Sequence, residues 1–418
     1  MFGMELIPVA ITAGVVFVYA LVSKRLERSV VTAPIAFVLV GLALGVSTTG
    51  MYDEAITEGG IGVLAEATLV LLLFTDAIRI DLGALRRQLA LPARLLGVGL
   101  PLTVLAGTLV GLALLGRVSI VEAALIAAIL APTDAALGDA VVSNERVPIR
   151  IRQALNVESG LNDGIMLPVV TVLLATLGAE ELSRGGWAGF AARQIGFGLL
   201  AGLIVGVAGA RLLDAAAARG WVEGTFRQLA TLAIGVGAFA VAVIVEGNGF
   251  VAAFVAGLAF GRVARDHCQG AYDFAEDEGR LLGLLTFLFF GAILLAPAIE
   301  DFTWQVGGYT LLSLTVVRML PVALSLWRSG VRPPTILYMG WFGPRGLASI
   351  LFALFVIESA DLPVADIVVT VTTWTVTASV LLHGATAAWL SNRYADWYER
   401  RGEPAMPESV VVEPMPTR

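Results

Sequence analysis

The sequence is poor in charged residues and nearly lacks the side chains that build disulfides and metal centres. Only 15% of its 418 residues are Asp, Glu, Lys or Arg, whereas a soluble domain has about 25%. The single cysteine, Cys268, excludes an intrachain disulfide and a cysteine metal cluster. The two histidines, His267 and His383, lie far apart and form no metal-ligand motif.

Long apolar runs take the place of charge. The chain is 57% hydrophobic with a mean hydropathy of +0.85, which indicates an all-α polytopic membrane protein, because a membrane helix needs about 20 apolar residues. Thirteen candidate transmembrane helices are predicted, and they lie at about 6–22, 30–48, 60–79, 95–115, 119–143, 153–178, 187–210, 228–246, 248–264, 281–297, 302–327, 334–358 and 364–392.

The distribution of basic residues supports this number of helices. With the N-terminus outside, 22 of the 27 basic residues fall in the connections that should face the cytoplasm, and only Arg117, Arg184 and Arg193 fall outside. Arg318 and Arg345 lie within spans. Since cytoplasmic loops are enriched in Lys and Arg, we expect a multi-pass protein of the cell (inner) membrane, with an outer N-terminus and a cytoplasmic C-terminus.

The remaining segments are expected to be connectors. Residues 1–395 form the transmembrane unit in this interpretation, and 396–418 a short cytoplasmic tail. Residues 80–94 are predicted to be a basic amphipathic connector, and 265–280 a polar cytoplasmic loop. The Pro- and Glu-rich sequence from about 402 predicts disorder.

Helix-breaking residues interrupt two of the spans. Pro132 lies in the fifth span, and Gly343-Pro344-Arg345-Gly346 lies in the twelfth. If helices 1–6 and 8–13 are repeats, both breaks fall in the fifth helix of a repeat, and the odd offset makes the repeats inverted. Broken helices at corresponding positions of inverted repeats indicate the binding site of a transporter.

The carboxylates of Asp134, Glu158 and Asp163 lie well inside spans 5 and 6. A charge at the centre of a bilayer helix costs about 2.5–3.5 kcal/mol on insertion scales, so such residues face a partner or an aqueous cavity. On span 6 the i, i+4 spacing places Glu158 with Asn162 and Ser159 with Asp163. An oxygen cage is predicted from Asp163, Ser159, Asp134 and the Thr133 main chain.

Carboxylates buried together have raised, coupled pKa values, so this cage can hold a proton or a metal cation but hardly both. That competition suffices for obligatory exchange if the site opens alternately to the two sides. A buried arginine needs a carboxylate partner, and we therefore pair Arg318 with Glu158. Arg345 is expected to offset the negative ends of the broken half-helices.

These residues resemble the sodium/proton exchanger family of the cation/proton antiporter superfamily. The resemblance extends to about residue 395 and is carried by Glu-Ser-x-x-Asn-Asp-Gly at 158–164, Pro-Thr-Asp at 132–134, the Arg318 helix and the Gly-Pro-Arg-Gly break. It implies that Asp163 binds the ion and the proton, with Asp134, Ser159 and the Thr133 main chain as Na⁺ co-ligands. Glu158 and Asn162 are also expected in the ion- and proton-binding set, and Glu158 with Arg318 resembles the family's buried ion pair.

The resemblance also implies an electroneutral 1:1 exchange, because Asn162 precedes Asp163 where electrogenic relatives have Asp-Asp. It implies a homodimer with core helices at about 60–178 and 281–392 and scaffold helices at about 6–48 and 187–264. In some relatives a carboxylate of helix 3 reaches the site, and the sequence leaves open whether Asp76 or Glu66 does so here.

The predicted function is Na⁺/H⁺ antiport by alternating access, with no cofactor and no nucleic-acid partner. The alternatives within transport are a K⁺/H⁺ antiporter of the same fold, Li⁺ exchange or an anion-coupled carrier. An intramembrane serine enzyme would need Ser159 near His383, and a passive channel would show conductance without proton coupling.

Overall fold

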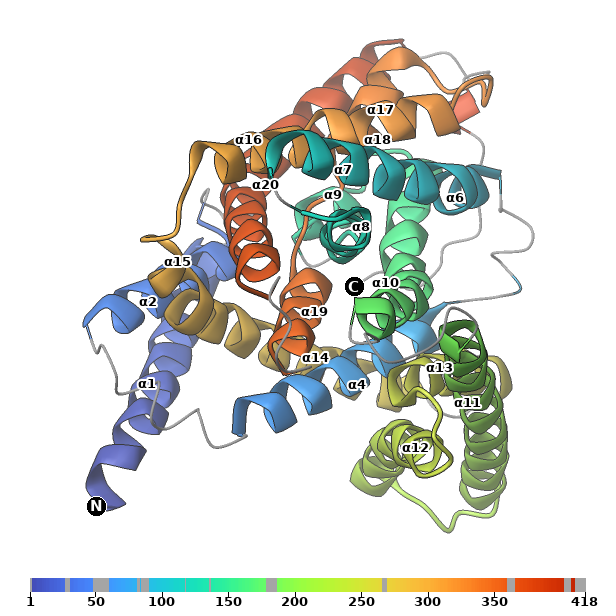
Figure 1. Ribbon diagram of the computed structural model, residues 1–418. Helices are drawn as coiled ribbons and strands as arrows, with labels where there is room; N and C mark the ends of the chain where they lie inside the picture. The colour runs from blue at the N-terminus through green and yellow to red at the C-terminus, as the bar shows by residue number, and fades with distance from the viewer. Residues whose placement is uncertain are drawn as a thin grey trace.

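The computed structural model of the chain describes residues 2–26, 31–47, 60–80, 83, 90–116, 118–134, 137–177, 186–264, 269–358, 365–401 and 407–409. All regular structure within these residues is helical (Figure 1). This outcome follows from the composition, because only a helix satisfies every backbone group of a single segment inside lipid.

In the first half of the chain, the described residues form nine α-helices, labelled between α1 and α11, and one π-helical segment. Their bounds are α1 (Phe2–Leu26), α2 (Ala33–Ser47), α4 (Gly60–Arg79), α6 (Ala90–Arg94), η1 (Leu95–Gly99), α7 (Leu100–Leu114), α8 (Ile120–Ile129), α9 (Asp139–Val142), α10 (Ile149–Leu177) and α11 (Gly186–Ala218). Ser119 and Glu122 form a capping box at the start of α8, which fixes where this helix begins.

The second half continues in the same manner, with α12 (Gly224–Ile244), α13 (Gly249–Val263), α14 (Gln269–Phe289), η2 (Phe290–Leu295), α15 (Ala296–Ala298), α16 (Trp304–Leu314), α17 (Val316–Ser325), α18 (Pro333–Trp341), α19 (Leu347–Glu358), α20 (Ala365–Arg401) and the 3₁₀ turn η3 (Pro407–Ser409). Asn248 accepts a hydrogen bond from the Val251 N–H and so caps α13.

Each of the thirteen predicted spans coincides with one of these helices or with a consecutive series of them, which confirms the predicted all-α membrane fold. Among the described residues, seven helices, some of them joined series, are long and apolar enough to cross a membrane unaided, and shorter apolar helices accompany them. The helices expected to be broken are broken: α8 ends at Ile129, before Pro132, and α18 and α19 are separated by residues 342–346.

The prediction for residues 265–280 was wrong: a loop was expected, but α14 begins at Gln269, so that the helix extends well beyond its apolar part. Of the segment from 402, which was expected to be disordered, the structure describes Pro407–Ser409, and these residues form the turn η3. The last long helix, α20, continues to Arg401. Hydropathy detects the part of a helix that lipid surrounds and misses its polar extension. The predicted connector at 80–94 lies mostly outside the described residues.

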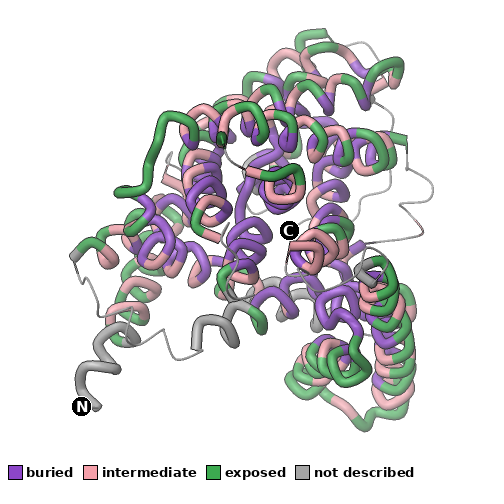
Figure 2. Tube along the Cα trace, in the orientation of Figure 1, coloured by how far each residue is buried: buried purple, intermediate pink, exposed green. Residues whose placement is uncertain are grey.

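The helices are arranged so that the two broken ones meet in the interior. Figure 1 shows α11, α12 and α13 grouped on one side, α7, α16, α17 and α18 on the opposite side, and α8, α10 and α19 between these groups. Buried residues concentrate along these central helices, while α11 and α12 expose large apolar side chains at the periphery (Figure 2). This arrangement is the one expected when the outer surface faces lipid.

Candidate functional site

The non-helical breaks of the fifth and twelfth spans bind each other. The Asp134 N–H donates to the Pro344 carbonyl at 2.8 Å, and the Leu347 N–H donates to Oδ2 of Asp134 at 2.8 Å. Leu347 is the first residue of α19, so the Asp134 carboxylate lies at the positive end of that helix. These bonds satisfy backbone groups that the breaks expose, which makes two broken helices tolerable inside a membrane.

Gly346 is required at this crossing. A Cβ atom at position 346 would overlap Oδ2 and Cβ of Asp134. A glycine is also required at position 343, because a Cβ atom there would overlap the Arg318 guanidinium. The glycines of the Gly-Pro-Arg-Gly break therefore provide room for the two ionised side chains that contact it.

A small enclosed cavity lies at the crossing. It is lined by the carboxylates Asp76, Asp134 and Asp163, by Thr133, and by leucines of α4 and α19. Its volume of about 10 Å³ is close to the least that holds one water-sized group. The cavity therefore has room for a single small occupant beside two or three carboxylates, as a desolvated monovalent cation or a protonated carboxyl requires.

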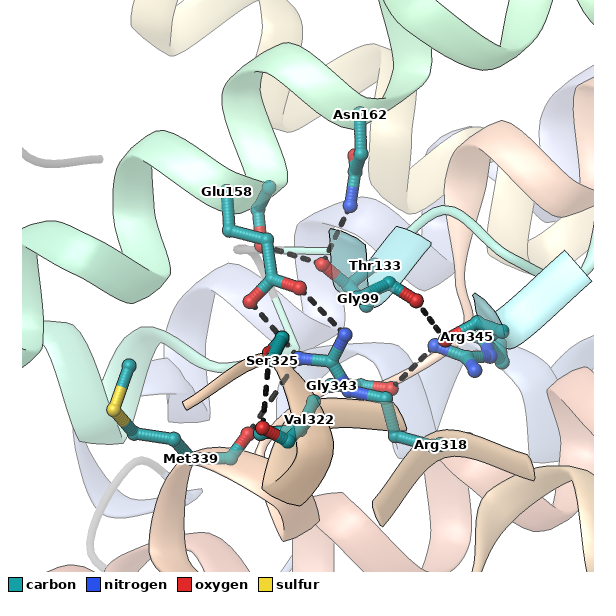
Figure 3. Close-up of polar contacts among 12 residues, drawn as sticks. Gly99, Thr133, Glu158, Asn162, Arg318, Val322, Ser325, Met339, Gly343 and Arg345 are labelled. Atoms are coloured by element: carbon teal, nitrogen blue, oxygen red, sulfur yellow. Dashed lines mark hydrogen bonds and ion pairs between the residues drawn. The ribbon is translucent and has the colours of Figure 1, made fainter. Parts of the chain in front are cut away.

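The hydroxyl of Thr133 links α10 to this cavity. Ser159 Oγ lies 3.0 Å from Thr133 Oγ1, and Nδ2 of Asn162 donates to the same oxygen at 2.7 Å. Figure 3 shows Asn162 pointing from α10 towards Thr133. Asn162 is completely buried, and Thr133 is 2% exposed. Ser159 and Asn162 thus hold Thr133, whereas Asp163 lines the cavity itself.

The expected pair between Glu158 and Arg318 is present and bidentate. Nη1 of Arg318 donates to Oε1 of Glu158 at 2.5 Å, and Nη2 donates to Oε2 at 2.9 Å. Both residues are 2% exposed, and the two side chains point towards each other from α10 and α17 (Figure 3). Because both carboxylate oxygens are engaged, Glu158 connects α10 to α17 and does not line the cavity.

Arg345 lies in the break itself and is completely buried. Its Nη1 donates to the Gly343 carbonyl at 2.9 Å, just beyond the end of α18, and its N–H donates to Oγ of Ser379 at 2.6 Å. This contact agrees with the predicted role, in which the guanidinium offsets the carbonyls freed at the end of a half-helix.

Two remaining candidates lie elsewhere. Glu66 lines a separate cavity of about 410 Å³, together with Glu246 and residues of α10, α11 and α13. Nε2 of His383 donates to the Trp341 carbonyl at 3.0 Å, and Nδ1 lies 3.1 Å from Oγ of Ser379, while Ser159 contacts Thr133. His383, the base that a serine nucleophile at Ser159 would need, therefore contacts other residues, which disfavours the serine-enzyme alternative.

Sequence reasoning missed the serines that support the breaks. Ser349 donates to the Ile129 carbonyl at the end of α8, at 2.7 Å, and Ser379 holds the backbone of Arg345. Both are completely buried. The available signal was weak, because an isolated serine in an apolar span is common. In the described part of the chain, no three His, Cys, Asp or Glu side chains form a resident metal centre.

Comparison with known proteins agrees with this geometry. The sequence profile of the family described as "Sodium/hydrogen exchanger, transmembrane" matches residues 12–393. The chain also resembles the solved structure of the sodium proton antiporter MjNhaP1 from Methanocaldococcus jannaschii at pH 8, with a TM-score of 0.76 at 20% identity, over 94% of this chain and 99% of that one.

Two curated relatives are similar in sequence. The K(+)/H(+) antiporter NhaP of Alkalimonas amylolytica is 25% identical over 350 residues, which are 82% of this chain and 59% of that protein. The probable Na(+)/H(+) antiporter C3A11.09 of Schizosaccharomyces pombe is 24% identical over 319 residues, 66% of this chain and 41% of that protein. The matches thus span about half the length of these relatives.

Proposed function

Because the chain belongs to the sodium/hydrogen exchanger family, we propose that it is a secondary transporter that exchanges protons for a monovalent cation, with Na⁺ as the first candidate. One observation carries this proposal: Asp134 and Asp163 line the same small cavity where two broken helices cross. Carboxylates in one buried cavity share protons and cations, since two like charges in such a site repel each other.

Asp163 is the residue that binds either the cation or the proton. Asp134, whose Oδ2 already accepts the Leu347 N–H, supplies a fixed negative charge, and Thr133 supplies oxygen to a hard cation. Ser159 and Asn162 keep Thr133 in place through its hydroxyl. Asp76 enters the same cavity from α4 and is a further oxygen ligand in this proposal.

We also propose a 1:1 exchange. Asn162, whose amide donates to Thr133 Oγ1 at 2.7 Å, precedes Asp163 on α10. A second carboxylate at position 162 would need a cation or proton of its own, and the uncharged amide needs none.

A K⁺/H⁺ antiporter is the second candidate. The curated relative from Alkalimonas amylolytica is named for K⁺, and the oxygen ligands of the cavity suit either ion. Ion replacement under otherwise identical conditions separates the two.

Alternating access requires one group of helices to move against another. We propose the core at about 60–178 and 281–392, and the scaffold at 6–48 and 187–264. In support of this division, α4 contacts α13 as well as α19, and α14 contacts both α2 and α19, so each of these helices contacts both proposed groups. A homodimer, the cell (inner) membrane and a cytoplasmic C-terminus belong to the same proposal; the mass of the detergent-solubilised protein and labelling of single cysteines from each side test them.

The decisive experiment is exchange in proteoliposomes with an acidic interior and a pH dye. Na⁺, K⁺ or Li⁺ is added outside to the wild type, to Asp163→Asn, and to Asp366→Asn as a matched control. Asp366 is an exposed carboxylate in the first turn of α20. We expect Na⁺ to dissipate the gradient in the wild type and the control only. Exchange retained by Asp163→Asn would overturn the site assignment, and no exchange in any protein would overturn the function.

A further inference from the structure

The first half of the broken twelfth helix is capped by a residue of the C-terminal tail. The side chain of Glu408, in η3, lies at the N-terminus of α18. Its Oε1 accepts hydrogen bonds from the Arg332 N–H and from the Thr335 hydroxyl, both at 2.8 Å. Glu408 is only 1% exposed, so this carboxylate has left water to make these bonds.

Within the described residues, the N-cap position of α18 supplies no side-chain cap of its own. Pro333 and Pro334 occupy the first positions of the helix and have no N–H group, and Arg332 is the N-cap residue. The Thr335 N–H bonds to the Arg332 carbonyl. The Arg332 N–H is therefore the donor left to be capped, and a carboxylate beside it also lies at the positive end of the helix.

Neighbouring elements hold the tail in this position. Arg150, in the first turn of α10, donates to the Pro407 carbonyl, and the Pro407 ring lies beside Gly330. The Tyr394 hydroxyl of α20 lies 3.0 Å from the Thr335 hydroxyl. Because the Thr335 hydroxyl donates its proton to Glu408, the Tyr394 hydroxyl is the donor in this contact.

The other end of α18 reaches the ion site. The Met339 carbonyl accepts from Nη2 of Arg318 at 3.5 Å, and the Trp341 carbonyl contacts Nε2 of His383 at 3.0 Å. Arg318 binds Glu158 on α10. A displacement of this nine-residue helix therefore shifts the groups that position α10 and the Gly343–Gly346 break.

We propose that Pro407–Ser409 is a latch, in which Glu408 caps α18 from outside the helix and thereby positions the cation site. The latch is a segment of the chain's own tail, and its contacts tie together the starts of α10 and α18, the two helices that lead to the cavity. Glu408 is a positioning residue and does not touch the transported ion. The consequence for cation affinity rests on the proposed antiport.

The test compares five proteins that all keep the complete transmembrane part. They are the wild type, a chain ending at Arg401, Glu408→Ala, Glu408→Gln, and Glu413→Ala, which controls for the loss of a charge elsewhere in the tail. Hydrogen–deuterium exchange at Arg332 reports docking, and exchange at Met339–Trp341 reports the position of the far end of α18. Proteoliposome assays with Na⁺ and K⁺ give the half-saturating cation concentration and the maximal rate.

We expect faster amide hydrogen–deuterium exchange at both ends of α18 in the truncated chain and in Glu408→Ala. The half-saturating concentration rises about fivefold in these two proteins, equivalent to about 1 kcal/mol, and the maximal rate changes less than about twofold. Glu408→Gln keeps the acceptor oxygen and restores most of the affinity, and Glu413→Ala matches the wild type. If the tail only stabilised the fold, its loss would not raise the half-saturating cation concentration while leaving the maximal transport rate nearly unchanged.

A double-mutant cycle strengthens the test. Thr335→Val removes one donor to Glu408 with little change of shape, and its effect should not add to that of Glu408→Ala, because both remove the same bond. Either of two results would overturn the latch. The first is an equal rate of amide hydrogen exchange at Arg332 in the wild type and the truncated chain. The second is faster amide hydrogen exchange in the truncated chain with an unchanged half-saturating cation concentration. If the wild type exchanges no cation for protons, the proposed function fails, and hydrogen exchange at both ends of α18 still decides the latch.

Discussion

Glu158 and Asp163 lie five residues apart on α10 and have different tasks. Both oxygens of Glu158 are bound by Arg318, whereas Asp163 lines the cavity between the broken helices. A buried ion pair contributes little net stability, because desolvation offsets the attraction, but the loss of one partner leaves an uncompensated charge. The main effect of the pair is therefore to fix α10 relative to α17, and its net contribution to stability is small.

This distinction predicts the behaviour of single and double variants. Glu158→Leu leaves Arg318 buried without its carboxylate, and we expect a loss of about 3–5 kcal/mol in the free energy of unfolding. The double variant Glu158→Leu with Arg318→Met should recover most of that loss. Thermal unfolding in detergent measures both. If the double variant is as unstable as the single one, the loss does not come from the unpaired charge of Arg318, and this interpretation is wrong.

At the scale of the element, the break between α18 and α19 depends on a residue without a side chain. Gly346→Ala would place a methyl group against the Asp134 carboxylate, and we expect exchange to fall at least about tenfold, since core overpacking costs about 1–3 kcal/mol. Gly97→Ala is the control, because a methyl group there meets nothing within 4 Å. Equal activity of the two variants in proteoliposomes would contradict the close crossing.

The polar extension of α20 gives a pH-dependent prediction. The hydrogen bond from Arg146, at 2.8 Å, holds the pKa of Glu399 below its usual value. A lowered folded pKa contributes stability that is present above the unfolded value of about 4.3 and is lost as the pH falls through the folded pKa. The melting temperature of Glu399→Gln should therefore lie below that of the wild type at pH 7 and approach it under acid conditions.

The matched control for this prediction is Glu223→Gln, which removes another exposed glutamate that makes no side-chain cap. The difference at Glu399 is expected to be small and to shrink with added salt, because both partners are exposed. A difference that persists below the folded pKa would contradict the assignment to this carboxylate.

At the scale of the whole molecule, the proposed alternating access implies that α10 moves relative to α13. Nδ2 of Asn248, the cap of α13, donates to Thr171 Oγ1 of α10 at 2.9 Å. Near this contact, the Phe250 and Phe355 rings pack edge to face, with centroids 5.8 Å apart. These contacts join the proposed core and scaffold in the conformation that the structure shows.

Thr171→Val removes the interdomain hydrogen bond and leaves Asn248 as the cap of α13. We expect the maximal rate of exchange to rise up to about fivefold, since a net hydrogen bond contributes about 0.5–1.5 kcal/mol to the resting conformation. The half-saturating cation concentration should not change. Thr176→Val is the control, because Thr176 bonds within α10, to the Val172 carbonyl. A changed affinity with an unchanged rate would contradict a role in the movement.

The sequence by itself determined the membrane helices, the positions of both breaks and the pairing of Glu158 with Arg318. Hydropathy and helix breakers act locally, and an ionised group in lipid must find the opposite charge, so these features follow without coordinates. The resemblance to the exchanger family, confirmed by the family match, rests on the same residues.

Only the tertiary structure decided which side chains share a cavity. Asp76 and Glu66 are both carboxylates of α4, yet Asp76 enters the cavity of Asp163 and Glu66 lines another one. The capping of α18 by Glu408 was likewise hidden, because the tail has the composition of a disordered segment. Contacts between residues distant in sequence depend on how helices cross, and periodicity within one helix carries no information about that crossing.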